Sequence, residues 1–164
     1  MNNLVGKPKP LQRPRPPILI GAGSRRILSI AAREADIIGV NPRTSEGGLD
    51  LASLTARTAV EKIKSLREVA GSRIGDVELN TYARLVAVTN YPRDAAESVI
   101  REWWSSTAVS ADDLLESPFV QIGTVDQIVE SLEKGRETYG LSYRVIFDAN
   151  LEEFAPVVGR LAGR

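Results

Sequence analysis

The stretch of residues 17–41, PILIGAGSRRILSIAAREADIIGVN, constrains the fold more than any other part of the chain. Residues 18–20 form an apolar run between a proline and a glycine, which is typical of a strand buried on both faces in a parallel sheet. Apolar residues then recur at the spacing of an amphipathic helix that Ser24 can cap. Residues 37–38 open a second buried strand. The stretch therefore predicts a βαβ unit with a right-handed crossover.

The turn of this unit, GAGS at residues 21–24, has the composition of an anion site. Backbone N–H groups approach an anion closely only where no side chain intervenes, and the helix that follows adds the positive end of its dipole. A phosphate group fits these requirements, although a tight turn into the helix explains the glycines equally well. A dinucleotide fingerprint is not supported, because Arg26 and Asn41 stand where a third glycine and an acidic residue are needed.

Composition narrows the possible partners and chemistry. Twenty-one basic residues balance twenty-one acidic ones, so no excess of positive charge draws the chain to nucleic acid or to an anionic membrane. The chain has no cysteine and no histidine, which removes disulfides, thiolate nucleophiles, imidazole bases and most zinc sites. We therefore expect no metal site, and chemistry only from carboxylates, hydroxyls, arginine, lysine or a bound cofactor.

The length of 164 residues and the 43% hydrophobic content suit one domain with an ordinary core. Residues 1–16 are rich in proline and basic residues and predict an extended arm or linker, and residues 17–164 predict a single α/β domain. No apolar run is long enough to span a bilayer, and the first residues do not resemble a signal peptide, so we expect a cytoplasmic location.

Strand and helix signals alternate along residues 17–164. The predicted strands are residues 18–20, 37–38, 77–89 (with a bend) and 143–147. The predicted helix starts are Ser24, Asp50, Asp94 with Glu97, Ser110, Thr124 with Gln127, and Asn150 with Glu153. Four β/α units amount to half of a (β/α)8 barrel of the TIM type, but they also suit an open sheet covered by helices on both faces.

Three segments in order, residues 13–42, 117–132 and 139–163, resemble the C-terminal half of luciferase-like (bacterial luciferase superfamily) flavin and deazaflavin oxidoreductases. The resemblance implies a TIM-type barrel whose fifth to eighth strands are the four predicted here. It also implies a flavin-type cofactor, the deazaflavin coenzyme F420 rather than FMN, which would remain the alternative. The family's site for the cofactor phosphate carries over to these residues: Gly21, Ala22, Gly23, Ser24, Val40 and Asn41.

The resemblance implies an oxidoreductase or monooxygenase that acts on a small organic substrate, with catalytic residues that the sequence does not identify. Most of the isoalloxazine pocket belongs to the first four units of such proteins, so we expect this chain to be incomplete for catalysis alone. Two free strand edges and an apolar inner face favour a homo-oligomer. The alternatives are a catalytically silent half-barrel binding or oligomerisation module and an unrelated phosphate-binding α/β domain.

Some further residues have both a functional and a structural interpretation. Arg84 lies in an apolar strand, where a charge needs a partner; it can reach a ligand, pair with Glu78 or point to solvent. Trp103 and Trp104 can stack on a flavin ring, but Trp103 lies on an apolar helix stripe and core packing is the better prediction. Arg25 and Arg26 at a helix start oppose the dipole, which makes sense beside a bound anion or on a solvated face.

Overall fold

The computed structural model describes residues 7–45, 48–103 and 109–163. Its centre is a four-stranded sheet in the order β1-β2-β5-β8, in which every neighbouring pair is parallel. The strands are β1 (Leu19–Ala22), β2 (Ile37–Val40), β5 (Glu78–Tyr82) and β8 (Leu141–Val145). The spatial order of the strands therefore follows their order in the chain, and each strand contains or overlaps a predicted one.

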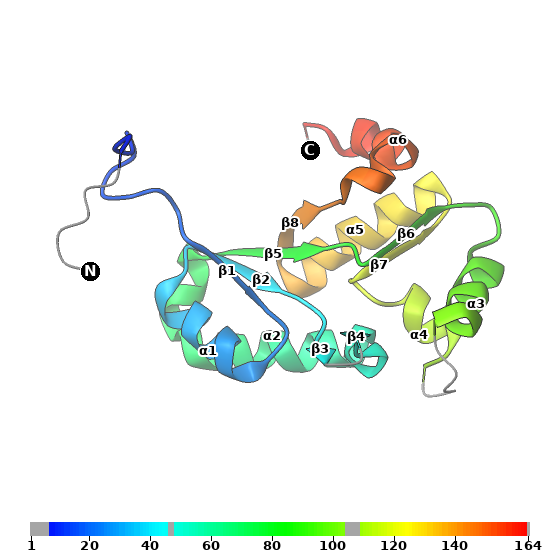
Figure 1. Ribbon diagram of the computed structural model, residues 1–164, viewed down its shortest axis with the longest axis horizontal. Helices are drawn as coiled ribbons and strands as arrows, with labels where there is room; N and C mark the ends of the chain where they lie inside the picture. The colour runs from blue at the N-terminus through cyan, green and yellow to red at the C-terminus, as the bar shows by residue number, and fades with distance from the viewer. Residues whose placement is uncertain (1–6, 46–47, 104–108, 164) are drawn as a thin grey trace.

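Helices cover one face of this sheet. Figure 1 shows α1 (Arg25–Glu34) and α2 (Ala56–Ala70) below β1, β2 and β5, while α5 (Val125–Tyr139) lies on the side of β8. The core between these helices and the strands is made of fully or almost fully buried apolar side chains, which include Leu28, Ala31, Ile38, Val40, Ile63, Leu66, Leu79 and Leu141. The fold is therefore of the α/β class, with helices packed on one face of a parallel sheet. The half-barrel stays a prediction.

The opposite face of the sheet carries no helix over β1, β2 and β5 (Figure 1). Alternation along the strands directs Leu19, Gly21, Gly39, Tyr82 and Tyr143 to this open face. The side chains of Leu19 and Tyr143 are 46% and 39% exposed, and Phe147, just after β8, is 47% exposed. The Tyr82 and Phe147 rings lie 5.6 Å apart between centroids. Large apolar groups are therefore exposed on this face.

The prediction of one bent strand over residues 77–89 was wrong. The chain changes sheets after β5, because the Ala83 N–H donates to Val145 O whereas the Arg84 N–H donates to Phe119 O. The following β6 (Leu85–Val88) pairs in parallel with β7 (Val120–Gly123), a strand that was not predicted. A run of β-branched residues signals a strand but does not say where the strand exchanges one partner for another.

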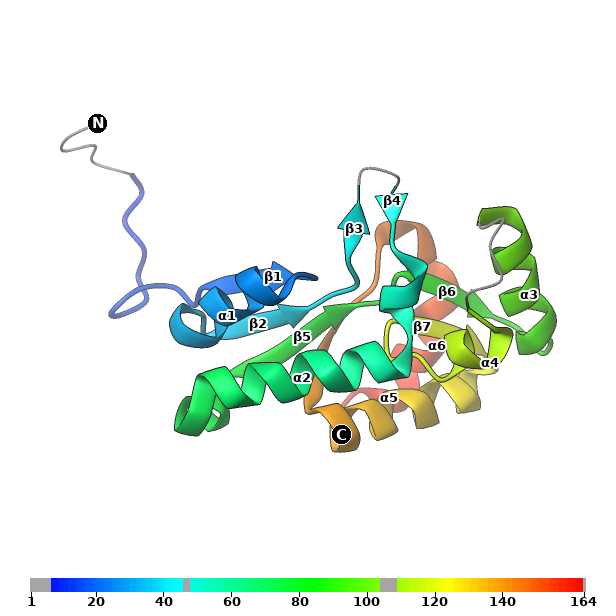
Figure 2. The same cartoon turned by 90° about the horizontal axis from the view of Figure 1, so that it is seen from below.

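The remaining elements surround these two sheets. They are the hairpin β3 (Thr44–Ser45) and β4 (Gly48–Leu49), the helices α3 (Pro92–Trp103), α4 (Ala111–Leu115) and α6 (Leu151–Leu161), and the 3-10 turns at Leu51–Leu54, Gly71–Asp76 and Asp148–Asn150. Figure 2 shows β3 and β4 side by side, projecting away from α2. In the part of the chain described, no helix has the length and apolar character needed to cross a membrane.

Some of the predicted helix starts were confirmed and others were wrong. Thr124 and Gln127 form the predicted capping box of α5, and Ser24 caps α1 by accepting from the Ile27 N–H at 3.5 Å. Asp50 was wrong as the cap of the long helix, because a 3-10 turn intervenes and Thr55 caps α2. Asp94 was also wrong, since α3 already begins at Pro92, a residue whose fixed φ suits a first helical position.

The last residues of the proline-rich arm are fastened to the sheet. Arg15 forms an ion pair with Asp36 in the α1–β2 turn, and the Asp36 carboxylate also accepts from the Ile18 N–H at 2.7 Å. These hydrogen bonds lower the pKa of Asp36 to about 2, because they favour its charged form. The described residues before Arg15 are exposed.

Candidate functional site

The structure brings the six predicted phosphate-site residues together at the carboxyl ends of β1 and β2. Gly21 pairs with Gly39 and Ala22 with Val40 in the parallel register, and the Asn41 N–H donates to Ala22 O at 3.0 Å. Ser24 follows at the exposed start of α1. Their grouping agrees with the prediction, and their role in binding stays a prediction.

The two glycines have packing roles that the sequence did not show. A Cβ on Gly23 would lie 2.3 Å from Pro42 O and 2.7 Å from Arg43 Cα, so the loop after β2 packs directly on this position. A Cβ on Gly21 would lie 3.0 Å from the Asn41 side-chain amide nitrogen. At Gly23 the absence of a side chain therefore makes room for backbone and not for a ligand.

The other predicted residues differ in what they can offer. Val40 is fully buried among the core residues, so only its backbone is available to a ligand. Asn41 is partly exposed at the end of β2, and Ser24 is exposed. Because the first N–H groups of a helix have no intrahelical acceptor, Ser24 and the first turn of α1 are the part of the predicted site best suited to an anion.

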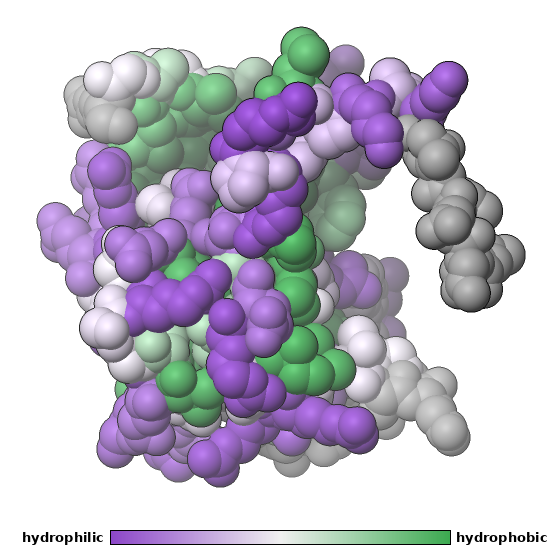
Figure 3. Space-filling view, turned by 90° about the vertical axis from the view of Figure 1, so that its left-hand side faces the viewer, coloured by the Kyte–Doolittle hydropathy of each residue, from purple (hydrophilic) through white to green (hydrophobic). Residues whose placement is uncertain are grey.

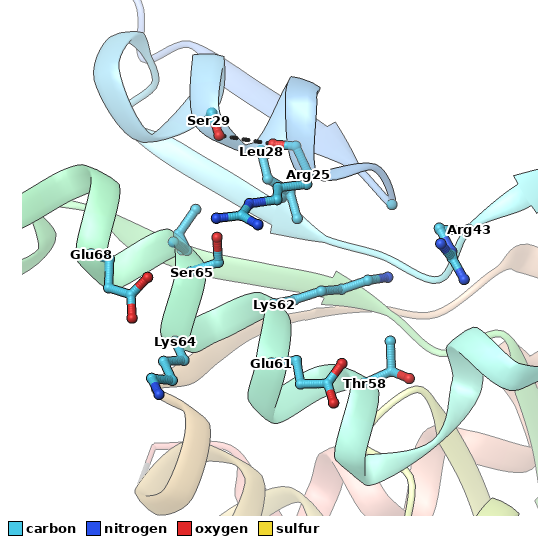
Figure 4. Close-up of a pocket in the computed structure, with 12 residues that line it drawn as sticks. Arg25, Leu28, Ser29, Arg43, Thr58, Glu61, Lys62, Lys64, Ser65 and Glu68 are labelled. Atoms are coloured by element: carbon cyan, nitrogen blue, oxygen red, sulfur yellow. Dashed lines mark hydrogen bonds between the residues drawn. The ribbon is translucent and has the colours of Figure 1, made fainter.

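A cavity of about 440 Å³ lies beside this turn, between α1 and α2 (Figure 4). Gly23 is one of the residues that line it. Its polar lining comes from α1, from the loop after β2 and from α2: Arg25, Ser29, Arg43, Thr58, Glu61, Lys62, Lys64, Ser65 and Glu68. The cavity is on the helix-covered side of the sheet, and it was not predicted.

Among the residues that line this cavity, Lys62 has the pKa that departs most from its ordinary value. Its ammonium donates to Asn41 O at 2.5 Å and lies 5.6 Å from the centre of the Phe119 ring. Burial, and after it the positive charge of Arg43, lower the pKa of Lys62 to about 8, although Asp50 acts in the opposite direction. No sequence signal marks Lys62, since a lysine on a helix is usually on a solvated face.

The arginines around the cavity differ in their pairing. Arg43 is held by Asp50 at 2.9 Å. Arg25 is exposed, and among the described residues no carboxylate forms an ion pair with its guanidinium. This exposure is compatible with both of its sequence interpretations, a contact with a bound anion and a solvated face.

Arg84 and Trp103, for which a ligand contact was one of several interpretations, contact each other. The Arg84 guanidinium lies 5.5 Å from the centre of the Trp103 ring, a cation–π arrangement. The ring of Trp103 is 47% exposed, so its prediction as a core residue was wrong. Trp104 lies outside the described residues. This pair is remote in the chain from the residues at the ends of β1 and β2.

Comparisons with known proteins identify a shared fold. No protein-family model matches the sequence, and no curated protein matches it significantly. The structure is similar to a long-chain alkane monooxygenase (LadA; TM-score 0.54, 14% identity), with 90% of this chain and 41% of that chain covered. It is also similar to an F420-dependent secondary alcohol dehydrogenase in complex with an F420-acetone adduct (TM-score 0.52, 12% identity; 88% and 47% covered).

A third similar structure is the monooxygenase RslO1 from Streptomyces bottropensis, with a TM-score of 0.51, 18% identity, and 85% of this chain and 42% of that chain covered. The chain therefore spans less than half of the length of these solved proteins. At such low identity the comparisons establish the fold alone, which is that of part of several oxidoreductases.

Proposed function

We propose that this chain forms the phosphate-binding part of a luciferase-like oxidoreductase or monooxygenase with a flavin-type cofactor. Two independent findings support the proposal. Three segments of the sequence resemble this superfamily, and the fold is similar to two monooxygenases and to an F420-dependent dehydrogenase. The observation that carries it is the parallel order β1-β2-β5-β8, which gathers the β/α loops at one edge of the sheet.

The residues at that edge fit a phosphate group. The exposed first turn of α1 offers backbone N–H groups, and Arg25 and Lys62 supply positive charge beside it. Ser24 and Asn41 provide polar side chains at the same edge of the sheet. When bound, the cofactor supplies the redox chemistry, hydride transfer for F420 or oxygen activation for FMN, and the described residues supply binding and orientation.

We further propose that F420 is bound in preference to FMN, which is the second choice. The finer resemblance of the sequence is to the deazaflavin branch, and one similar structure is a complex with an F420-acetone adduct. Since the similar proteins are more than twice as long as the matched region, we propose that catalysis requires further β/α units, from the same polypeptide or from another chain.

A second candidate function is a silent binding or oligomerisation module. It is favoured by the open face of the sheet, where Leu19 and Tyr143 are exposed. Figure 3 shows green hydrophobic patches that interrupt the charged surface at the end of the molecule where β1 begins. The outer strands β1 and β8 add edges that can pair with another chain.

Titration with F420 and with FMN, followed by cofactor fluorescence, tests the first function, and light scattering on the same samples measures the assembly mass. The most informative variant is Ser24→Asp, because aspartate is also a good helix cap but sets a carboxylate against the phosphate. We expect affinity to fall about tenfold with little change in stability, a loss of about 1.4 kcal/mol in binding. Ser110→Asp, which alters the cap of α4, is the matched control.

Equal affinities for the wild type and Ser24→Asp would remove the turn of α1 from the site. Absence of binding to either cofactor, together with a stable dimer, would favour the assembly module.

A further inference from the structure

Lys62 is a half-buried amine on the wall of the cavity between α1 and α2. Its nitrogen donates to Asn41 O at 2.5 Å, and in the described parts of the chain no carboxylate forms an ion pair with it. The side chain extends from α2 towards Arg43 (Figure 4), so a second cation faces it. The positive charge of Lys62 is therefore poorly compensated.

Two attractions offset this only in part. The Phe119 ring lies 5.6 Å from the nitrogen in a cation–π contact, and Asp50, the carboxylate that acts on Lys62, is already paired with Arg43 at 2.9 Å. Burial, and after it Arg43, lower the pKa to about 8, so about a tenth of the amine is unprotonated at pH 7. An ordinary lysine is unprotonated there on the order of several hundred times less often.

We propose that the amine of Lys62 is a modification site, at which dissolved CO₂ adds to form a carbamate. The nitrogen lone pair forms a bond to the carbon of CO₂, one C–O π bond becomes a lone pair of a carboxylate oxygen, and the nitrogen releases a proton to water. CO₂ is small and uncharged, so it can enter a half-buried space without the desolvation penalty that an ionic reagent would incur.

The carbamate suits these surroundings better than the ammonium does. Its nitrogen keeps one N–H for Asn41 O, and its two oxygens are acceptors. Arg43 contacts Asp50 through one terminal nitrogen, whereas a guanidinium has five N–H donors in all. The repulsion between two cations becomes an attraction between opposite charges.

The modification would also reverse the charge that Lys62 contributes beside the proposed cofactor phosphate. On that account CO₂ would weaken cofactor binding, a consequence that rests on the proposed function. The carbamate itself needs no cofactor, because it depends on Lys62, Asn41 and Arg43.

The test is chemical trapping of the carbamate. The full chain, without flavin, is equilibrated with ¹³C-labelled or unlabelled CO₂ and treated with triethyloxonium, which converts a carbamate into a stable ethyl ester, and each lysine peptide is measured by mass spectrometry. Lys64 is the internal control, because it lines the same cavity but is exposed and extends away from Arg43 in Figure 4. We expect at least about tenfold more trapped ester at Lys62 than at Lys64.

Arg43 variants test the surroundings of the amine. Arg43→Gln should lower trapping at Lys62 about fivefold or more, because it removes both the repulsion of the ammonium and the partner of the carbamate. Arg43→Lys, which keeps the charge, should retain part of the trapping. Arg57→Gln is the matched control, since Arg57 is exposed and does not line the cavity. The Arg43 side chain is 56% exposed, so neither variant should unfold the protein.

Equal trapping at Lys62 and Lys64, an ester whose mass does not follow the isotope of the added CO₂, or unchanged trapping in Arg43→Gln would each overturn the proposal. Because the reaction contains no flavin, failure of the cofactor titration described above leaves a trapped carbamate standing, and failure of trapping leaves the cofactor proposal to its own test.

Discussion

Replacing Gly23 by alanine tests whether this glycine serves packing. The new Cβ would lie 2.3 Å from Pro42 O and 2.7 Å from Pro42 C and Arg43 Cα, all of them backbone atoms. Pro42 is buried, the preceding Asn41 N–H is bonded to Ala22 O, and the Arg43 N–H donates to the Ser53 hydroxyl at 2.7 Å, so this loop is held at both contact points. Gly23 is not among the glycines with positive φ, so the effect of alanine is steric and not conformational.

The size of the effect follows from the contact distances. Ordinary carbon contacts are about 3.5–4 Å, so the loop must move by roughly 1 Å or the turn of α1 must tilt. Such overpacking costs about 1–3 kcal/mol, and loss of the Asn41 to Ala22 hydrogen bond would add about 1 kcal/mol. We expect the free energy of unfolding to fall by about 2–4 kcal/mol, a large part of the stability of an ordinary domain.

Urea unfolding followed by circular dichroism measures this loss. Gly75→Ala is the matched control, because a Cβ on Gly75 meets no atom within 4 Å and its φ is not positive. The control should stay within about 0.5 kcal/mol of the wild type or become slightly more stable. If Gly23→Ala unfolds at the same urea concentration as the control, the packing argument fails. If Gly23→Ala is destabilised as expected, loss of ligand binding in Gly23 variants cannot by itself identify a ligand contact.

Three further predictions concern other parts of the molecule. Thr124→Ala should lower the free energy of unfolding by about 1 kcal/mol, because it removes the capping box with Gln127; a loss below about 0.3 kcal/mol in urea unfolding would mean that the cap is redundant. Arg144→Met should be neutral or stabilising by about 1 kcal/mol, because the guanidinium is largely buried with Nε and one terminal nitrogen unpartnered, and its other terminal nitrogen donates to Pro118 O at 2.6 Å. A clear loss of stability in thermal unfolding would mean that this charge has a partner in solution. Lys62 has a folded-state pKa of about 8, below its ordinary 10.5, so the unfolded chain binds more protons between these values and stability rises with pH through that window. After allowance for its partial exposure, the rise attributable to this lysine should be about 1 kcal/mol, measured as the difference between the wild type and Lys62→Met in urea unfolding across that range; equal pH slopes would contradict it.

The βαβ unit could be predicted from the sequence because its signals are local. The apolar run of residues 18–20, the helical periodicity after Ser24 and the cap itself depend on neighbours within one turn or strand. The same is true of Thr124 and Gln127. The prediction of Asp50 as the helix cap was wrong because a 3-10 turn follows Asp50, and Thr55 after that turn caps α2.

The parts that could not be predicted depend on partners distant in the chain. The division of residues 77–89 between two sheets follows from the bonds of Ala83 and Arg84 to different strands, and no local pattern encodes that choice. The close packing at Gly23 was hidden for the same reason. The cavity at Lys62 requires two helices and a loop to meet, so its cations look like ordinary surface residues in the sequence.

The open face of the sheet has an uneven relief. Gly21 and Gly39 lie side by side in β1 and β2, where an added Cβ would meet the Asn41 amide nitrogen at 3.0 and 3.3 Å, whereas Tyr82 and Phe147 place two aromatic rings on the other half of the face. A surface that docks on this face must therefore make room for the two rings before it can approach the backbone of β1 and β2.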